Sequence, residues 1–345
     1  MLRQLAKLTR PLDAAGSDAL AVAVYADRVD EHVQASESGF EGVACVDDAA
    51  RLLDVLCDVW TATRLDWVER WTRGLLEFVL WMQEPDGRWV NFVYDWEGRR
   101  NTAGITSVTG ENFWHARALV GVSHAYLTFG DPRAEAALHR GLDHAVGKPA
   151  PPDVRALHVL TAHRLMAAGH ARTLSIAIRH WIEELLACRD GDVLKNSPFE
   201  RTTPHLWAHI QEGVIVESAA LLEEPAWIEV AAASARALIA PVVERSFPGE
   251  GITAYDVASC VYVLDRLHGA TGDPSWGELA TEARAWFDGR NTVGAPVYDR
   301  DRGRVADGID DGRVSANSGA ESNVMGAEAL FDAAVACARA MPPAF

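Results

Sequence analysis

Residues 111–146 read E-N-F-W-H-A-R-A-L-V-G-V-S-H-A-Y-L-T-F-G-D-P-R-A-E-A-A-L-H-R-G-L-D-H-A-V. Apolar residues recur every three to four positions on both sides of Gly130-Asp131-Pro132, which predicts two helices joined by a tight turn. Glycine suits the end of one helix, aspartate the N-cap of the next, and proline its first turn. The tripeptide recurs as Gly272-Asp273-Pro274, so the chain uses this helix hairpin more than once.

Helical patterning continues through most of the chain and predicts about twelve helices. They are expected at residues 17–28, 47–63, 66–83, 111–128, 132–146, 153–168, 172–188, 205–222, 225–246, 254–270, 274–288 and 318–341. Short turns between these helices alternate strictly with long polar connections, which gathers the long loops at one end of the array. We therefore expect an all-α fold, an (α/α)6 toroid of inner and outer helices, with an open α-solenoid as the rival architecture.

No linker rich in Ser, Gly or Pro interrupts the chain. We expect residues 1–345 to form a single toroid domain, with about the first 15 residues as an arm. Alternating residues over 88–94, flanked by turn signals, predict one short β-hairpin near residues 88–95.

The 345 residues carry 32 Lys+Arg against 49 Asp+Glu, a formal net charge of −17, which disfavours nucleic acid as a partner. The chain has no stretch of about 18 apolar residues without charges, so the sequence predicts no membrane span. The five cysteines are odd in number and scattered, without a C-x-x-C pair, so neither a zinc cage nor a disulfide framework is indicated. We expect a cytoplasmic protein with reduced thiols and no metal or other cofactor.

Two adjacent carboxylates, Asp47 and Asp48, open the second predicted helix. One of them would serve as N-cap while the other complements the helix dipole. Asp48 would alternatively pair with Arg51 three positions later, or point into a cleft as an acid or base.

The connection over residues 84–110 and the helix start after it mix flat aromatic side chains with amide and carboxylate groups. Such mixtures suit sugars, whose rings present C–H faces and radial hydroxyls, although the tryptophans would serve a core equally well. Glu111 lies in the first turn of a predicted inner helix, with His115 one turn later. The starts of later inner helices contribute His205, Trp207, Asp256 and Glu321, and Ser318 with Glu321 fits a capping box.

Four segments in order resemble one family. They are residues 42–51 (GVACVDDAAR), 86–92 (DGRWVNF), 115–119 (HARAL) and 317–322 (NSGAES). Together they are similar to bacterial (α/α)6-toroid proteins, six-hairpin-glycosidase-like, that are associated with or fused to glycosyltransferases. The resemblance implies a six-hairpin toroid, carbohydrate chemistry and a glycosyltransferase as a partner. Val46 and Ala49 depart from the family pattern, which usually has Thr and Asn there.

The leading hypothesis is a glycoside hydrolase acting on an oligosaccharide or glycoconjugate by an inverting mechanism, with Glu111 as general acid and Asp48 as general base. Swapping these two roles is a close alternative. Twelve further residues are expected to bind the substrate. They are Asp47, Trp89, Asn91, Tyr94, Asp95, Trp114, His115, Arg117, His205, Trp207, Asp256 and Glu321.

Three other functional hypotheses are compatible with the sequence. A uronate-directed lyase or hydrolase, or a sugar epimerase, would hold its substrate through Arg99, Arg100 and Arg117 and use His115 or His205 as base. A non-catalytic glycan-binding or partner-docking toroid would keep the aromatic residues without an acid/base pair. Asp47-Asp48 also has a faint likeness to the magnesium motifs of prenyl-diphosphate enzymes, but Arg51 stands where a further aspartate is needed.

Overall fold

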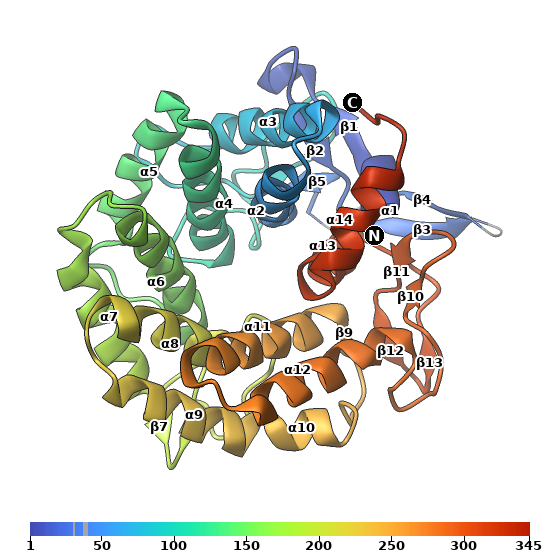
Figure 1. Ribbon diagram of the computed structural model, residues 1–345. Helices are drawn as coiled ribbons and strands as arrows, with labels where there is room; N and C mark the ends of the chain where they lie inside the picture. Colours follow the sequence, from blue (N-terminus) through green and yellow to red (C-terminus); the bar gives the residue numbers. More distant parts are fainter. Residues whose placement is uncertain (30–31, 37–40) are drawn as a thin grey trace. The chain divides into compact units, whose positions relative to one another are not determined.

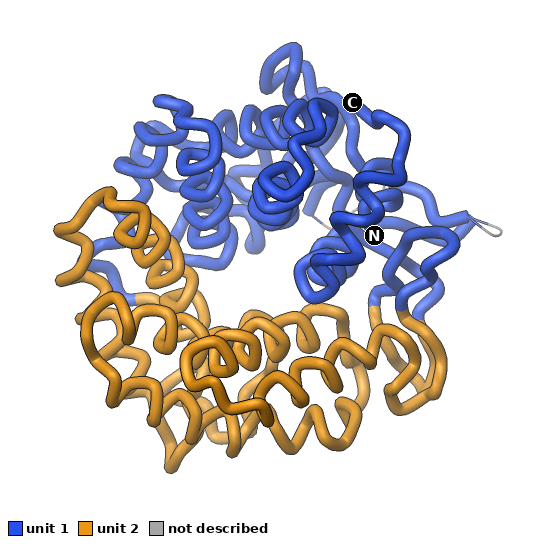
Figure 2. The backbone as a smooth tube through the Cα atoms, viewed as in Figure 1, with its two compact units in different colours: residues 1–149, 298–307, 315–345 blue, residues 150–297, 308–314 orange. Residues whose placement is uncertain are grey.

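The computed structural model describes residues 1–29, 32–36 and 41–345. The chain divides into two compact units, which Figure 2 distinguishes by colour. Unit 1 comprises Met1–Pro149, Tyr298–Asp307 and Ser315–Phe345, and unit 2 comprises Ala150–Val297 and Gly308–Val314. The single-domain organisation expected from the missing linker stays a prediction.

The helices of unit 1 carry most of its core (Figure 1). They are α1 (Leu2–Leu8), η1 (Asp13–Ala15), α2 (Val46–Thr63), α3 (Asp66–Trp81), α4 (Phe113–Phe129), α5 (Pro132–Ala145), α13 (Ala320–Ala329) and α14 (Phe331–Ala340). Within the unit, α2 packs against α3, α4 and α13, and α4 packs against α5. The helix α2 buries a broad apolar face that includes Leu52, Leu53 and Leu56, as an inner helix should.

Short antiparallel strand pairs accompany these helices. They are β1 (Thr9–Pro11) with β2 (Leu20–Val22), β3 (Ala26–Val29) with β4 (His32–Ala35), β5 (Ala44–Cys45) with β6 (Phe92–Val93), and β10 (Tyr298–Asp299) with β11 (Arg304–Val305). Of the short β-hairpin expected near residues 88–95, the structure contains the strand β6, and Val93 bridges to Arg100 across the turn that follows. Its main partner, β5, directly precedes α2 in the sequence. The pairing of β5 with β6 therefore places the start of α2 beside residues 90–93.

The helices of unit 2 form three antiparallel pairs, α6 with α7, α8 with α9, and α11 with α12 (Figure 1). Its elements are α6 (Pro152–Ala167), α7 (Leu174–Ala187), β7 (Arg189–Asp190), β8 (Val193–Leu194), α8 (Gln211–Leu221), α9 (Ala226–Leu238), α10 (Ala240–Glu244), β9 (Ile252–Thr253), α11 (Ala254–Thr271), α12 (Pro274–Ala285), η2 (Trp286–Asp288), β12 (Gly308–Asp310) and β13 (Arg313–Val314). The central strand β12 pairs with both β9 and β13.

The repeated tripeptide forms the same turn in each unit. Gly130 and Gly272 end α4 and α11 in the left-handed conformation, both with φ of 66°. Asp131 and Asp273 then cap α5 and α12 through their side chains, with proline in the first turn. These two hairpins are confirmed as predicted.

Several predicted helices differ from the structure. Residues 17–28 form β2 and β3, because a short run of buried apolar residues fits a strand as well as a helix. The predicted helix 205–222 begins only at Gln211, since Ala208 adopts a left-handed φ of 58°. The helix expected over 318–341 is interrupted at Leu330, which ends α13.

The start of the chain is not an arm. Leu2, Leu5 and Leu8 are fully buried, and α1 packs against α13 and α14. In unit 2, Ala226–Glu244 is long and apolar enough to span a membrane by length and composition alone. A core helix passes the same test, and α9 and α10 pack against α8 and α12.

Candidate active site

The start of α2 holds a group of closely paired charged side chains in unit 1. Neither aspartate there caps the helix, because the Cys45 sulfur accepts the Asp48 backbone N–H at 3.4 Å. The Asp47 backbone N–H donates instead to Oδ1 of Asn91, 3.0 Å away. The expected N-capping role of an aspartate is therefore wrong, and both carboxylates take part in side-chain interactions.

Asp47 is held by two guanidinium groups. Arg117 of α4 donates to both of its carboxylate oxygens, and Arg51 lies 3.7 Å away. Burial alone would raise the pKa of Asp47, but the two positive charges outweigh burial and lower it. Asp47 is accordingly ionised at neutral pH, and the expected contribution of Arg117 to the site is an ion pair with this carboxylate.

Asp48 has the opposite electrostatic setting. Its Oδ1 accepts from Nη2 of Arg51 at 2.6 Å, which confirms the predicted local ion pair. Burial raises the pKa of Asp48 to about 6 in spite of Arg51, with Glu321 and Asp47 adding to the rise. Two neighbouring carboxyl groups thus have pKa values pushed apart, a pattern that marks acid and base roles in enzymes.

Glu321 completes this group. Its Oε2 accepts from the same Arg51 Nη2 at 3.0 Å, and 46% of its side chain is exposed. The predicted capping box of Ser318 and Glu321 is wrong, because Ser318 donates to the carbonyl of Val305. Asp307 serves the helix start instead and accepts the Gly319 N–H at 2.6 Å. Glu321 is thereby left to face Arg51. We call Asp47, Asp48, Arg51, Arg117 and Glu321 the carboxylate cluster.

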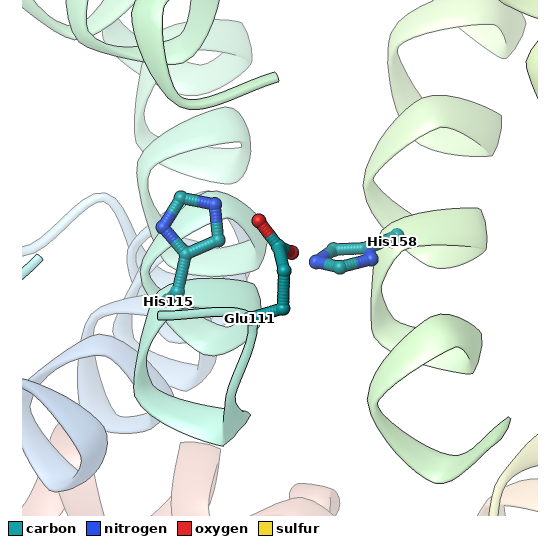
Figure 3. Close-up of side chains that lie close together, drawn as sticks. All are labelled: Glu111, His115 and His158. Carbon is teal, nitrogen blue, oxygen red and sulfur yellow. The ribbon is translucent and has the colours of Figure 1, made fainter. Parts of the chain in front are cut away.

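Glu111 lies in a different environment, just before the start of α4. Asn112 is the N-cap of that helix, so Glu111 precedes the first turn in which it was expected. Its Oε1 lies 2.8 Å from Nε2 of His144 on α5. Figure 3 shows Glu111 and His115 side by side at the start of α4; the third residue drawn, His158, belongs to α6 of unit 2.

His115 is fully buried behind Glu111. Its ring lies edge-on to the His144 ring, with the two centroids 5.5 Å apart. Burial, reinforced by the neighbouring His144, lowers the pKa of His115 to about 4. His115 is therefore a neutral imidazole at neutral pH, and its predicted contact with a substrate stays a prediction.

Two of the expected sugar-binding residues belong to the scaffold. Trp89 is fully buried and donates from Nε1 to the carbonyl of Val79 at 2.8 Å. Asn91 is also buried, and its amide joins the Asp47 N–H to the carbonyl of Thr106. Trp114 is half-buried and donates to the Trp89 carbonyl. Asn91 thus positions the start of α2, and the fully buried ring of Trp89 offers no exposed face to a sugar.

Tyr94 and Asp95 lie on the turn after β6. Tyr94 is 45% exposed, and Asp95 pairs with Arg99 at 2.5 Å. A cleft of about 560 Å³ lies in the same part of unit 1. It is lined by Glu84, Pro85, Asp86, Arg88, Val90, Thr102, Val108 and Thr109. None of the predicted site residues lines this cleft.

Unit 2 has its own group of polar and aromatic side chains before α8. His205 Nε2 lies 3.6 Å from Asp153 of α6, and its ring stacks on Trp207. Burial raises the pKa of Asp153. Asp256, by contrast, accepts from the Thr253 N–H and hydroxyl in a capping box at the start of α11. Asp256 therefore serves as a helix cap, and its expected role in substrate binding stays a prediction.

Three polar residues beside these groups were not predicted from the sequence: His144, Asp153 and Asp307. His144 and Asp153 gave no signal beyond their residue type, since their partners Glu111 and His205 lie far away in sequence. Asp307 gave no signal either, yet its carboxylate accepts the backbone N–H of Gly319, the N-cap residue of α13. Glu250, Asp310 and Asp311 of that region converge closely enough to hold a cation, but all three are exposed, which is common without one.

The chain has the fold of known (α/α)6-toroid enzymes. No protein-family model and no curated protein matches it. A sugar epimerase from a ruminal bacterium matches with a TM-score of 0.69 and 12% identity, covering 99% of this chain and 96% of that chain. The cellobiose 2-epimerase of Spirochaeta thermophila matches with a TM-score of 0.67 and 12% identity, covering 97% of this chain and 94% of that chain. A GH76 α-mannanase of Bacteroides thetaiotaomicron matches with a TM-score of 0.59 and 12% identity, covering 86% of this chain and 88% of that chain. The predicted toroid class is confirmed.

Proposed function

We propose that this protein is a carbohydrate-active enzyme that hydrolyses a glycosidic bond. The observation that carries the proposal is the carboxylate cluster, in which Asp48 has a pKa raised to about 6 and shares Arg51 with Glu321. Hydrolysis of a glycoside needs one carboxyl that donates a proton and another that acts as nucleophile or base. The names of the toroid proteins that share this fold, epimerases and a mannanase, support a sugar as substrate.

Asp48 is the proton donor in this proposal. A general acid must still hold its proton near the working pH, and burial gives Asp48 that property. Glu321 is the more exposed partner and acts on the anomeric carbon, either directly or through water. Arg51 fixes both groups, while Asp47 stays ionised between Arg51 and Arg117. This assignment reverses the role first expected for Asp48 and replaces Glu111 by Glu321.

The spacing favours retention of the anomeric configuration. The two carboxylate oxygens lie 2.6 Å and 3.0 Å from one nitrogen of Arg51. They are therefore within about 6 Å of each other, closer to the spacing of about 5–5.5 Å in retaining enzymes than to the 6.5–9.5 Å of inverting ones. The inverting alternative would pair Asp48 with Glu111.

The test is a screen of nitrophenyl glycosides and natural oligosaccharides, followed by variants on any substrate found. Asp48→Asn and Glu321→Gln should each lower kcat by about 10²–10⁴-fold. Asp58→Asn is the matched control, because this carboxylate also lies on α2 but is 55% exposed beside His124. Proton NMR of the first-formed anomer distinguishes the two carboxyl pairs. Retention of configuration would support Asp48 with Glu321, and inversion would favour Asp48 with Glu111. Full turnover by both Asp48→Asn and Glu321→Gln would rule the proposal out.

A sugar epimerase is the second candidate, and one observation in unit 2 favours it. His205 Nδ1 lies 2.9 Å from the Trp207 carbonyl, which fixes the proton on Nδ1 and turns Nε2 toward Asp153. A histidine with a fixed tautomer suits proton abstraction beside a carbonyl. Epimerisation in D2O would place deuterium at the inverted carbon without a new reducing end, whereas a new ultraviolet-absorbing double bond would indicate a lyase.

Two further expectations stay proposals. The motif resemblance supports a glycosyltransferase as partner, which co-purification from the source cell would test. The scattered cysteines support a cytoplasmic location, and all five are free thiols in the structure. Cell fractionation with an antibody against the protein would test the location.

A further inference from the structure

Trp207 differs from the other tryptophans of the chain. All twelve lie in the described residues, and Trp207 is the only one classed as exposed, with 38% of its surface accessible. Trp71, Trp89, Trp181, Trp276 and Trp286 are among the largest fully buried side chains. Leaving part of an indole accessible to water forgoes part of the stabilisation that full burial of so large an apolar surface supplies. An exposed tryptophan beside candidate catalytic groups therefore points to a ligand.

The indole is held rigidly. The His205 ring stacks on it with centroids 3.9 Å apart and planes 9° from parallel. His205 Nδ1 contacts the carbonyl of Trp207 itself at 2.9 Å, which ties the two residues together through backbone and ring. The next residue, Ala208, is buried in a left-handed conformation with φ of 58°, which residues other than glycine rarely adopt. Backbone strain of this kind concentrates at ligand sites.

Polar groups border the exposed ring. Asp153 at the start of α6 faces His205 at 3.6 Å, and Tyr255 in the first turn of α11 has its ring centroid 6.3 Å from that of Trp207. A flat apolar surface thus adjoins a carboxyl and an imidazole, all within unit 2. A pyranose ring requires this combination, because its C–H face packs on an aromatic ring while its hydroxyls seek acceptors and donors at the side.

We propose that Trp207 is the stacking platform of a saccharide subsite in unit 2, with His205 binding hydroxyls of the stacked sugar and the buried Asp153 positioning His205. The subsite rests on the proposed carbohydrate function but is independent of which reaction occurs. Its ligand is a neutral pyranose unit of an oligosaccharide. The net charge of −17 disfavours a nucleotide, the other common ligand that stacks on tryptophan.

Calorimetric titration with cellotetraose and with mannotetraose tests this subsite. The titrated protein carries Asp48→Asn so that the sugar is not consumed. We expect at least one sugar to bind, Trp207→Ala to weaken it about tenfold or more, and Trp207→Phe to retain most of the affinity. Phe199→Ala is the matched control, because Phe199 is an 88% exposed aromatic residue in the same connection before α8. An unchanged melting temperature shows that each variant folds.

Two results would overturn the subsite. One is equal affinity in the Trp207→Ala variant and its parent, and the other is no binding of either sugar by the parent. These results are distinct from failure of the hydrolase proposal. Weaker binding by Trp207→Ala together with full turnover by Asp48→Asn and Glu321→Gln would keep the subsite and remove the assigned acid/base pair.

Discussion

Arg51 and Glu321 are 270 positions apart in the sequence, yet their side chains form an ion pair of 3.0 Å. The same guanidinium nitrogen also binds Asp48, so one positive charge serves two carboxylates from α2 and α13. Removing that charge should affect folding and chemistry together.

We predict that Arg51→Met destabilises the protein by about 3–5 kcal/mol, because it leaves the buried Asp48 carboxylate without its partner. Urea denaturation would measure the loss. Protonation relieves the repulsion between the carboxylates, so the loss should be smaller at pH 5 than at pH 8. The Arg51→Lys variant retains the positive charge and should therefore lose less stability than Arg51→Met. Equal losses at both pH values would contradict this view of the cluster.

The pKa of Asp48 predicts a second pH dependence. Its folded value of about 6 lies above the ordinary 3.8, so the folded state binds this proton more tightly than the unfolded state. The resulting stabilisation is complete below about pH 4 and is lost as the pH rises through 6. Relative to Asp48→Asn, the wild type should therefore lose up to about 3 kcal/mol between pH 4 and 8. Unfolding curves of both proteins across that range give the difference, and parallel curves would contradict the raised pKa.

His115 should behave in the opposite way. Its pKa is lowered to about 4, so its stabilising effect is present above pH 6.5 and is lost as the pH falls toward 4. In an NMR titration, the Cε1 proton of His115 should keep its neutral-imidazole shift down to about pH 5. The exposed His180, 66% accessible on α7, serves as a reference ring in the same spectrum. A midpoint near 6.5 for His115 would show that the ring is hydrated.

Gly141 should tolerate no side chain while Trp89 is present. A Cβ atom at Gly141 would lie 2.6 Å from the Trp89 ring and 2.9 Å from Leu119. Replacing a helical glycine by alanine ordinarily stabilises a helix, but Gly141→Ala should destabilise this protein by about 1–3 kcal/mol. In the Trp89→Leu background the penalty should shrink, which a double-mutant cycle of unfolding free energies would detect. If the changes in unfolding free energy of Gly141→Ala and Trp89→Leu simply add in the double variant, the alanine side chain does not clash with Trp89.

The helix hairpins could be predicted because their signals are local. Gly130-Asp131-Pro132 contains the stop, the cap and the start of its turn within three residues. The pairing of β5 with β6 and the strand at residues 20–22 were not predictable in the same way, because a short buried strand depends on a distant partner.

The candidate site could be predicted only in part. Asp48 and Arg51 share one helix turn, so their ion pair followed from spacing. Residue type alone could not show that Trp89 is buried, that Asp256 caps α11, or that Glu111 meets His144. Each of these depends on which side chains the fold brings together, and a single sequence does not encode that in any local pattern.

The packing of α1 against α13 has a consequence for biosynthesis. Gln4 donates to the carbonyl of Ser318, 314 positions later, and the leucines of α1 are fully buried in this unit. The ribosome makes α1 long before α13 emerges, so these leucines lack their helical partner while the residues in between are made. Unit 1 therefore cannot complete its core before α13 has been synthesised, and its early apolar helix is a natural binding site for chaperones in the nascent chain.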